Sequence, residues 1–89
     1  MARFDFGTME NGTMGADAQA DILFNMGLMY ATGRDCETDL VAAHKWFNLA
    51  AMKGIVEARA KRAEISAELG AGEIAEAQKQ ARAWLAQLH

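Results

Sequence analysis

Residues 24–54 read FNMGLMYATGRDCETDLVAAHKWFNLAAMKG and are the most informative part of the chain. Small residues stand among large apolar ones at regular places, and a polar loop divides the stretch into two halves. Gly27 and Ala43 can lie at a crossing of two helices, where a larger side chain would hold the backbones apart. The space on either side would be filled by Tyr30, Trp46 and Phe47. The pattern predicts two α-helices that pack very closely.

The order of these residues resembles the Sel-one-like repeat, a relative of the tetratricopeptide repeat. The positions that fall on the family pattern are Met26, Gly27, Tyr30, Gly33, Asp39, Ala43, Trp46, Phe47, Ala50, Ala51, Gly54 and Ala58. They span about one repeat of that family. The family usually has a glycine and a valine where this chain has Asp35 and Cys36. We therefore expect the loop between the two helices to differ from that of the family.

The second half of the chain echoes the first. The corresponding residues are Ala43, Trp46 and Phe47 in the first half and Ala81, Trp84 and Leu85 in the second. Internal similarity of this kind indicates stacked helical hairpins. With the resemblance, it predicts an all-α fold of two stacked antiparallel hairpins, a short α/α superhelix similar to a fragment of an α-solenoid. The chain would hold one full repeat and a degenerate C-terminal capping unit, with both tryptophans largely buried.

Periodicity, glycines and capping residues predict an N-terminal arm followed by four helices. The arm covers residues 1–15, which contain three glycines and no helical period, and the repeat domain covers 16–89. The expected helices span about 16–32, 39–53, 56–69 and 71–88. Asp39 or Thr38 is expected to cap the second helix, and Glu73 to support the start of the fourth.

Length and composition exclude several classes of function. A chain of 89 residues forms one domain, and its net charge of -3 gives no general electrostatic case for nucleic acid. A single cysteine excludes an internal disulfide framework. The first residues lack the apolar core of a signal peptide, and no apolar run approaches the length that spans a membrane. We expect a cytoplasmic protein with no nucleic-acid and no membrane partner.

Residue types that bind metals are present but poorly spaced. His44 and His89 have no carboxylate or cysteine at ligand spacing, so neither predicts a metal site. Asp35, Glu37 and Asp39 alternate as in a calcium loop, but the turn glycine and the terminal glutamate of such a loop are missing. Helix capping and solvation explain these acids better.

Catalytic signals are equally weak. Cys36 takes the place of the family's loop valine, which favours a small buried apolar role over that of a nucleophile, although a histidine brought close by the fold stays open. No phosphate-binding loop is present. The sequence offers no catalytic residue, no cofactor site and no metal site, and we expect a protein that is not an enzyme.

The first predicted helix is apolar around most of its circumference. Its apolar residues are Ile22, Leu23, Phe24, Met26, Leu28, Met29 and Tyr30. A helix of this kind is normally covered on two sides, and in a longer array the preceding repeat would cover one of them. Here we expect the arm, a second copy of the chain or a partner protein to cover it. The arm carries the apolar residues Phe4, Phe6, Met9 and Met14.

The resemblance implies non-catalytic binding of a protein or peptide, because Sel-one-like proteins commonly serve as adaptors and regulators. The groove would be lined by the first helix of each hairpin. The candidate partner-binding residues are Asp21, Asn25, Leu28, Met29 and Thr32, with Arg59 and Arg62 on the third helix. Together with Lys61, the two arginines form a basic cluster that is either a solvated face or a patch for an acidic partner segment.

Two other classes of function remain open. The chain could be an obligate structural homodimer whose contact is the apolar first helix. Some cysteine-rich relatives of the repeat family are linked to β-lactam binding or hydrolysis, which makes a hydrolase of that type the remote alternative. This chain lacks their paired cysteines and has no Ser-Lys or Cys-His constellation in its sequence.

Overall fold

The computed structural model describes residues 14–88, and all of their regular structure is α-helical. The four helices are α1 (Met14–Thr32), α2 (Leu40–Met52), α3 (Val56–Ser66) and α4 (Ala71–Ala86). The predicted all-α fold is therefore confirmed. Of the expected arm, residues 14 and 15 belong to α1, and residues 1–13 lie outside the described residues.

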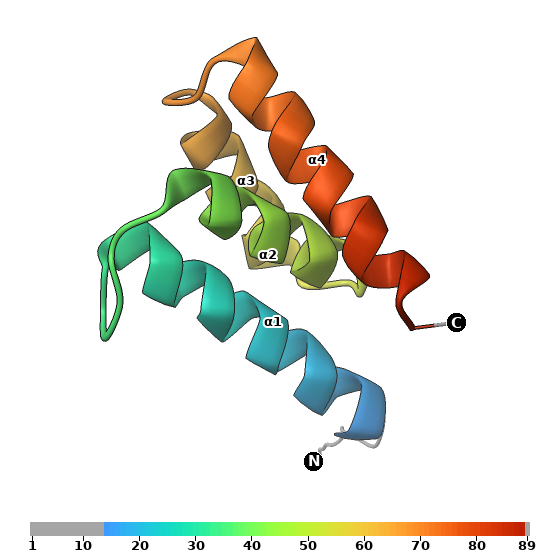
Figure 1. The fold of residues 1–89 in the computed structure, drawn as a ribbon. Coiled ribbons are helices and arrows are strands. Elements are labelled where there is room, and N and C mark those ends of the chain that lie inside the picture. The colour runs from blue at the N-terminus through green and yellow to red at the C-terminus, as the bar shows by residue number, and fades with distance from the viewer. Residues whose placement is uncertain (1–13, 89) are drawn as a thin grey trace.

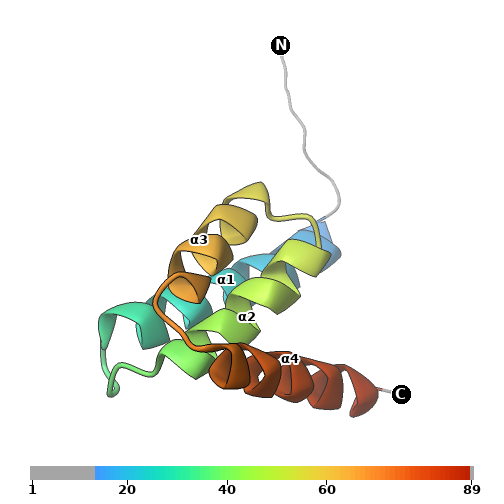
Figure 2. The same ribbon diagram turned by 90° about the horizontal axis from the view of Figure 1, so that it is seen from above.

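Helix α2 occupies the centre of the molecule and packs against α1, α3 and α4 (Figure 1). Helices α1 and α2 form the first antiparallel hairpin, whereas α3 and α4, which were expected to form the second, both pack against α2 and hardly against each other. Seen from above, α3 and α4 diverge from their shared turn, and α2 lies between them (Figure 2). The second hairpin is thus splayed around α2, and the main packing of α4 is on α2.

The junction between α1 and α2 is built from a glycine and an aspartate. Gly33 ends α1 with a φ of 76°, in the left-handed region, and donates its N–H to the Met29 carbonyl at 2.8 Å. Asp39 caps α2, because its Oδ1 accepts the N–H of Ala42 at 3.0 Å. The N–H of Asp39 also donates to the Tyr30 carbonyl at 2.9 Å, which ties the start of α2 to the end of α1.

Helix α3 ends at Ser66, three residues before the expected end at residue 69. The N–H groups of Glu68 and Leu69 bond carbonyls three residues back, at 2.9 and 3.2 Å, so the chain tightens into a turn. This turn lets Leu69 pack against the core instead of continuing the helix. Beyond it, Glu73 Oε1 accepts the Gly70 N–H at 2.9 Å and supports the start of α4, as expected.

Side chains from all four helices form the core. Its buried members are Leu23 on α1, Ala43, Trp46, Phe47, Leu49 and Ala50 on α2, Ala58 and Ile65 on α3, and Ala81 on α4. The largest share comes from α2 because this helix contacts the other three. Small residues on α3 and α4 allow both helices to approach α2 closely.

The two tryptophans that the sequence pairs as equivalents contact each other. Their ring centroids are 5.8 Å apart and the rings meet edge to face, a favourable aromatic geometry. Trp46 is 9% exposed, which confirms its predicted burial, but Trp84 is only half-buried. The expectation for Trp84 was too strong because α4 rests on α2 and leaves neighbours such as Ala83 and Gln87 exposed.

Candidate functional site

The predicted partner-binding residues of α1 divide into two groups. Asp21, Asn25 and Thr32 are exposed, whereas Leu28 and Met29 are half-buried. Leu28 packs against the core, and the Thr32 hydroxyl donates to the Leu28 carbonyl at 2.8 Å. The exposed members remain available to a partner, but part of Leu28 is used by the fold.

The predicted basic cluster on α3 is similarly divided. Arg59 and Lys61 are exposed, whereas Arg62 is half-buried. The Arg62 guanidinium donates to Asn48 Oδ1 at 2.6 Å, across the contact between α3 and α2. Arg62 therefore helps to hold two helices together, and a partner would have to compete with Asn48 for it.

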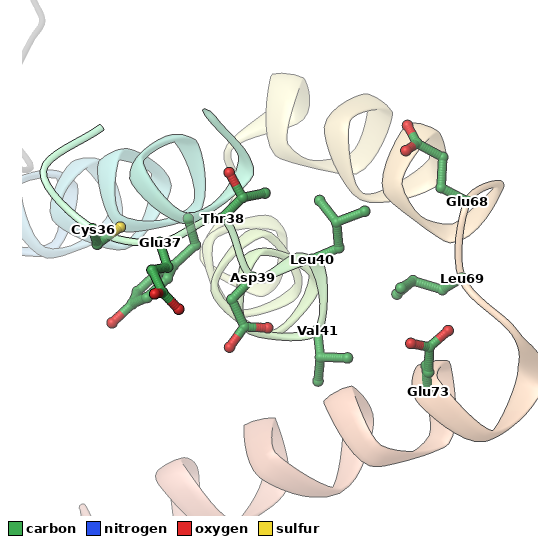
Figure 3. Close-up of a pocket in the computed structure, with 10 residues that line it drawn as sticks. Cys36, Glu37, Thr38, Asp39, Leu40, Val41, Glu68, Leu69 and Glu73 are labelled. Carbon is green, nitrogen blue, oxygen red and sulfur yellow. The ribbon is translucent and has the colours of Figure 1, made fainter. Parts of the chain in front are cut away.

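An open cleft of about 530 Å³ lies at the end of the molecule where the two connections come together. We call it the loop cleft. It lies between the loop that joins α1 to α2 and the turn that joins α3 to α4 (Figure 3). It is lined by Tyr30, Cys36, Glu37, Thr38, Asp39, Leu40, Val41, Glu68, Leu69 and Glu73. None of the seven predicted partner-binding residues lines it.

The floor of the loop cleft is apolar. Leu40 and Val41 line its α2 side, and Leu69 lines the side of the α3–α4 turn (Figure 3). All three side chains are half-buried, as is Tyr30. Leu40, Leu69 and Tyr30 also pack against the core. Val41 lines the cleft but is not among the residues that pack against the core. These residues come from different helices and turns, so the cleft exists only in the folded chain.

The rim of the loop cleft is acidic. Glu37 and Asp39 stand on the side of the α1–α2 loop, and Glu68 and Glu73 on the side of the α3–α4 turn (Figure 3). All four are exposed, and no lysine, arginine or histidine is among the residues that line the cleft. Asp39 and Glu73 each accept one backbone N–H at a helix start, which orients their carboxylates. The sequence indicated the capping role of Asp39 but not its place on a cleft.

Cys36 belongs to the same loop. Its thiol donates to the Met29 carbonyl at 3.5 Å, a weak hydrogen bond that holds the loop against the end of α1. The side chain is half-buried and lines the cleft, so it is less buried than the sequence suggested.

A buried polar contact joins α2 to α3. His44 is 2% exposed, and its Nε2 lies 3.0 Å from Ser66 Oγ. Its Nδ1 is buried and has no hydrogen-bond partner among the described residues. Burial lowers the pKa of His44 below its usual 6.5, and the positive charge of Arg62 lowers it further. The imidazole is therefore kept neutral.

The contact between His44 and Ser66 is not arranged for catalysis. A histidine that activates a serine is itself oriented by a third group on its other nitrogen. Nδ1 of His44 lacks such a group in the described part of the chain, and the burial of the ring closes it to a substrate. We interpret the pair as a link between helices, which the sequence did not predict.

A second, shallower cleft of about 180 Å³ lies between α2 and α4. It is lined by Lys45, Gln80, Ala83, Trp84 and Gln87. The Lys45 ammonium stands 4.2 Å from the centroid of the Trp46 ring, where the π-face attracts it. Three of its five lining residues are polar, and because it is smaller it offers less apolar surface than the loop cleft.

Comparison with protein-family models, curated proteins and solved structures finds no match. The resemblance to the Sel-one-like repeat thus rests on the residues that carry it. Among residues 14–88, no group of three or more His, Cys, Asp or Glu side chains is placed to hold a metal ion. No helix of that range combines the length and apolar character needed to cross a membrane.

Proposed function

We propose that this protein is a non-catalytic interaction module, an adaptor or regulator that binds a segment of a partner protein in the loop cleft. The observation that carries the proposal is an apolar floor that stays half-exposed inside a cleft of about 530 Å³. A cleft of this size accommodates one or two anchoring side chains of a peptide. Burial of such anchors supplies much of the affinity of a protein interface.

Two further considerations support the proposal. The resemblance to the Sel-one-like repeat implies adaptors and regulators, for which a cytoplasmic location is the natural setting. The buried contact between His44 and Ser66 joins two helices, and the loop cleft is lined by no serine or histidine, which favours binding over catalysis at the cleft. The exposed residues predicted on α1 and α3 provide a second surface that a larger partner could reach.

Val41 is the residue of choice for a test, because it lines the loop cleft without packing against the core. The wild-type protein and Val41→Gln would be used to capture proteins from the native cell, followed by mass spectrometry. The matched control is Val56→Gln, which makes the same change on α3 at a side chain that is 75% exposed and outside the cleft. We expect Val41→Gln to lose the partner and the control to keep it. Equal capture by all three proteins would refute the loop cleft as the binding site.

A further inference from the structure

The charge of the loop cleft identifies the kind of segment that fits it. We propose that its occupant is a basic peptide segment in which lysine or arginine residues flank one apolar anchor. This inference rests on the proposed function and adds the chemistry of the partner. It combines two separate features of the cleft, the apolar floor and the acidic rim.

The apolar floor favours a peptide that carries an apolar anchoring side chain. Leu40, Val41 and Leu69 leave part of their surface open between the two connections (Figure 3). A leucine or methionine side chain that entered here would remove apolar surface from water on both partners, which favours binding. A free metal ion or a small polar cation would gain nothing from this floor, so the floor favours a peptide.

The acidic rim favours positively charged residues on both sides of the peptide's anchor. Glu37 and Asp39 approach from one side and Glu68 and Glu73 from the other, with no cation among the residues between them. An extended peptide that crosses the floor would therefore meet carboxylates both before and after its anchor. Exposed charges of this kind raise the rate of encounter and select against acidic partners more than they raise affinity. Their effect falls as salt rises.

Four synthetic peptides of equal length test the inference by fluorescence polarisation. The first has a central leucine with lysine and arginine flanks, and the second has the same leucine with glutamine flanks. The third keeps the leucine between glutamate flanks, and the fourth keeps the basic flanks around a central glycine. We expect the first to bind most tightly, the third not to bind, and the affinity of the first to fall as salt is raised.

Variants of the protein show where on its surface the peptide binds. Glu37→Gln with Glu68→Gln removes one charge from each side of the cleft and should weaken the first peptide roughly three- to ten-fold at low salt. The matched control is Glu64→Gln with Glu76→Gln, which removes the same charge from exposed positions outside the cleft and should have little effect. Amide shifts in a nuclear magnetic resonance titration should centre on residues 36–41 and 68–73.

Several results would overturn the inference. If the glutamine-flanked peptide bound as tightly as the first peptide, charge would not select the partner. If the glycine peptide bound as tightly as the first, the apolar floor would not select it either. Equal weakening by both double variants, or shifts centred elsewhere, would show that the rim does not hold the flanks. If no peptide binds, the inference also fails. Capture by wild type but not by Val41→Gln would still support the proposed function in each case, so the two failures are distinguishable.

Discussion

The ring of Phe47 on α2 lies directly against the backbone of α1 at Gly27, where α1 has no side chain of its own. A Cβ added to Gly27 would stand 2.5 Å from Cδ1 of Phe47 and 2.6 Å from Cε1. Phe47 is 1% exposed, and the ring of Phe24 packs against it with centroids 5.6 Å apart. The ring therefore has little room to move. Gly27 lies at a close contact between α1 and α2, as the sequence predicted, but the residue against it is Phe47 and not Ala43.

Gly27→Leu should destabilise the domain severely. Overpacking a filled site typically costs about 1–3 kcal/mol, and here even Gly27→Ala should be destabilising although alanine favours a helix. Thermal melts of both variants measure the effect. Gly72→Ala is the control, because no atom lies within 4 Å of the added Cβ in α4 and the change should be neutral or stabilising by up to about 1 kcal/mol. An unchanged or higher melting temperature for Gly27→Ala would contradict the crossing.

The two tryptophans should differ in how much stability is lost when each is replaced by alanine and in their exposure to solvent. Trp46→Ala should cost about 3–5 kcal/mol, because the ring is nearly buried, and Trp84→Ala should cost less. Chemical denaturation measures both. Iodide quenching of Trp84→Phe and Trp46→Phe, each with one tryptophan left, reports exposure directly. Easy quenching of Trp46, with emission near that of free tryptophan, would count against the packing of α4 on α2.

Stability should fall on mild acidification because of His44. In the folded state the pKa of His44 lies below 6.5. As the pH falls below 6.5, His44 therefore becomes protonated in the unfolded chain while it stays neutral in the folded chain. The contribution of neutral His44 to the free energy of unfolding is complete above pH 6.5 and is lost as the pH falls toward the folded pKa. The free energy of unfolding then falls by at most about 1.4 kcal/mol per pH unit. Denaturation between pH 7.5 and 5.5 measures this slope. His44→Gln removes the titration, and an equal slope in wild type and variant would exclude His44 as its source.

The outer side of α1 should be covered in the working protein. Ile22 is 58% exposed and Met26 and Met29 are half-buried, so an apolar strip remains open on the described chain. Deletion of residues 1–13 separates the possible covers by light scattering and hydrophobic-dye binding. If the arm is the cover, the truncated protein should bind dye or self-associate. If a second copy is the cover, a dimer should survive truncation and dissociate with Ile22→Glu.

Controls complete the test of the α1 face. Met29→Glu alters the same strip, whereas Leu28→Glu would also disturb the core against which Leu28 packs. Val56→Glu makes a comparable change at an exposed residue of α3 and should leave the association state unchanged. If the truncated protein and the glutamate variants all stay monomeric and bind no dye, this face needs no cover.

The number, order and approximate ends of the helices follow from the amino-acid sequence alone. The apolar period is a local property of the chain, and so are Gly33 and Asp39, which end one helix and start the next through bonds to residues a few places away. The close crossing at Gly27 was also predictable, because a glycine on an apolar helix face leaves room for a neighbour.

The position of the candidate site depends on tertiary packing. Leu40 and Leu69 both line the loop cleft, although the rest of α2 and the whole of α3 lie between them in the chain. Their meeting depends on the splay of α3 and α4 around α2 and on the early end of α3 at Ser66. The buried contact of His44 with Ser66 has the same origin. No local pattern encodes such pairs, because crossing angles follow from the summed packing of many distant side chains.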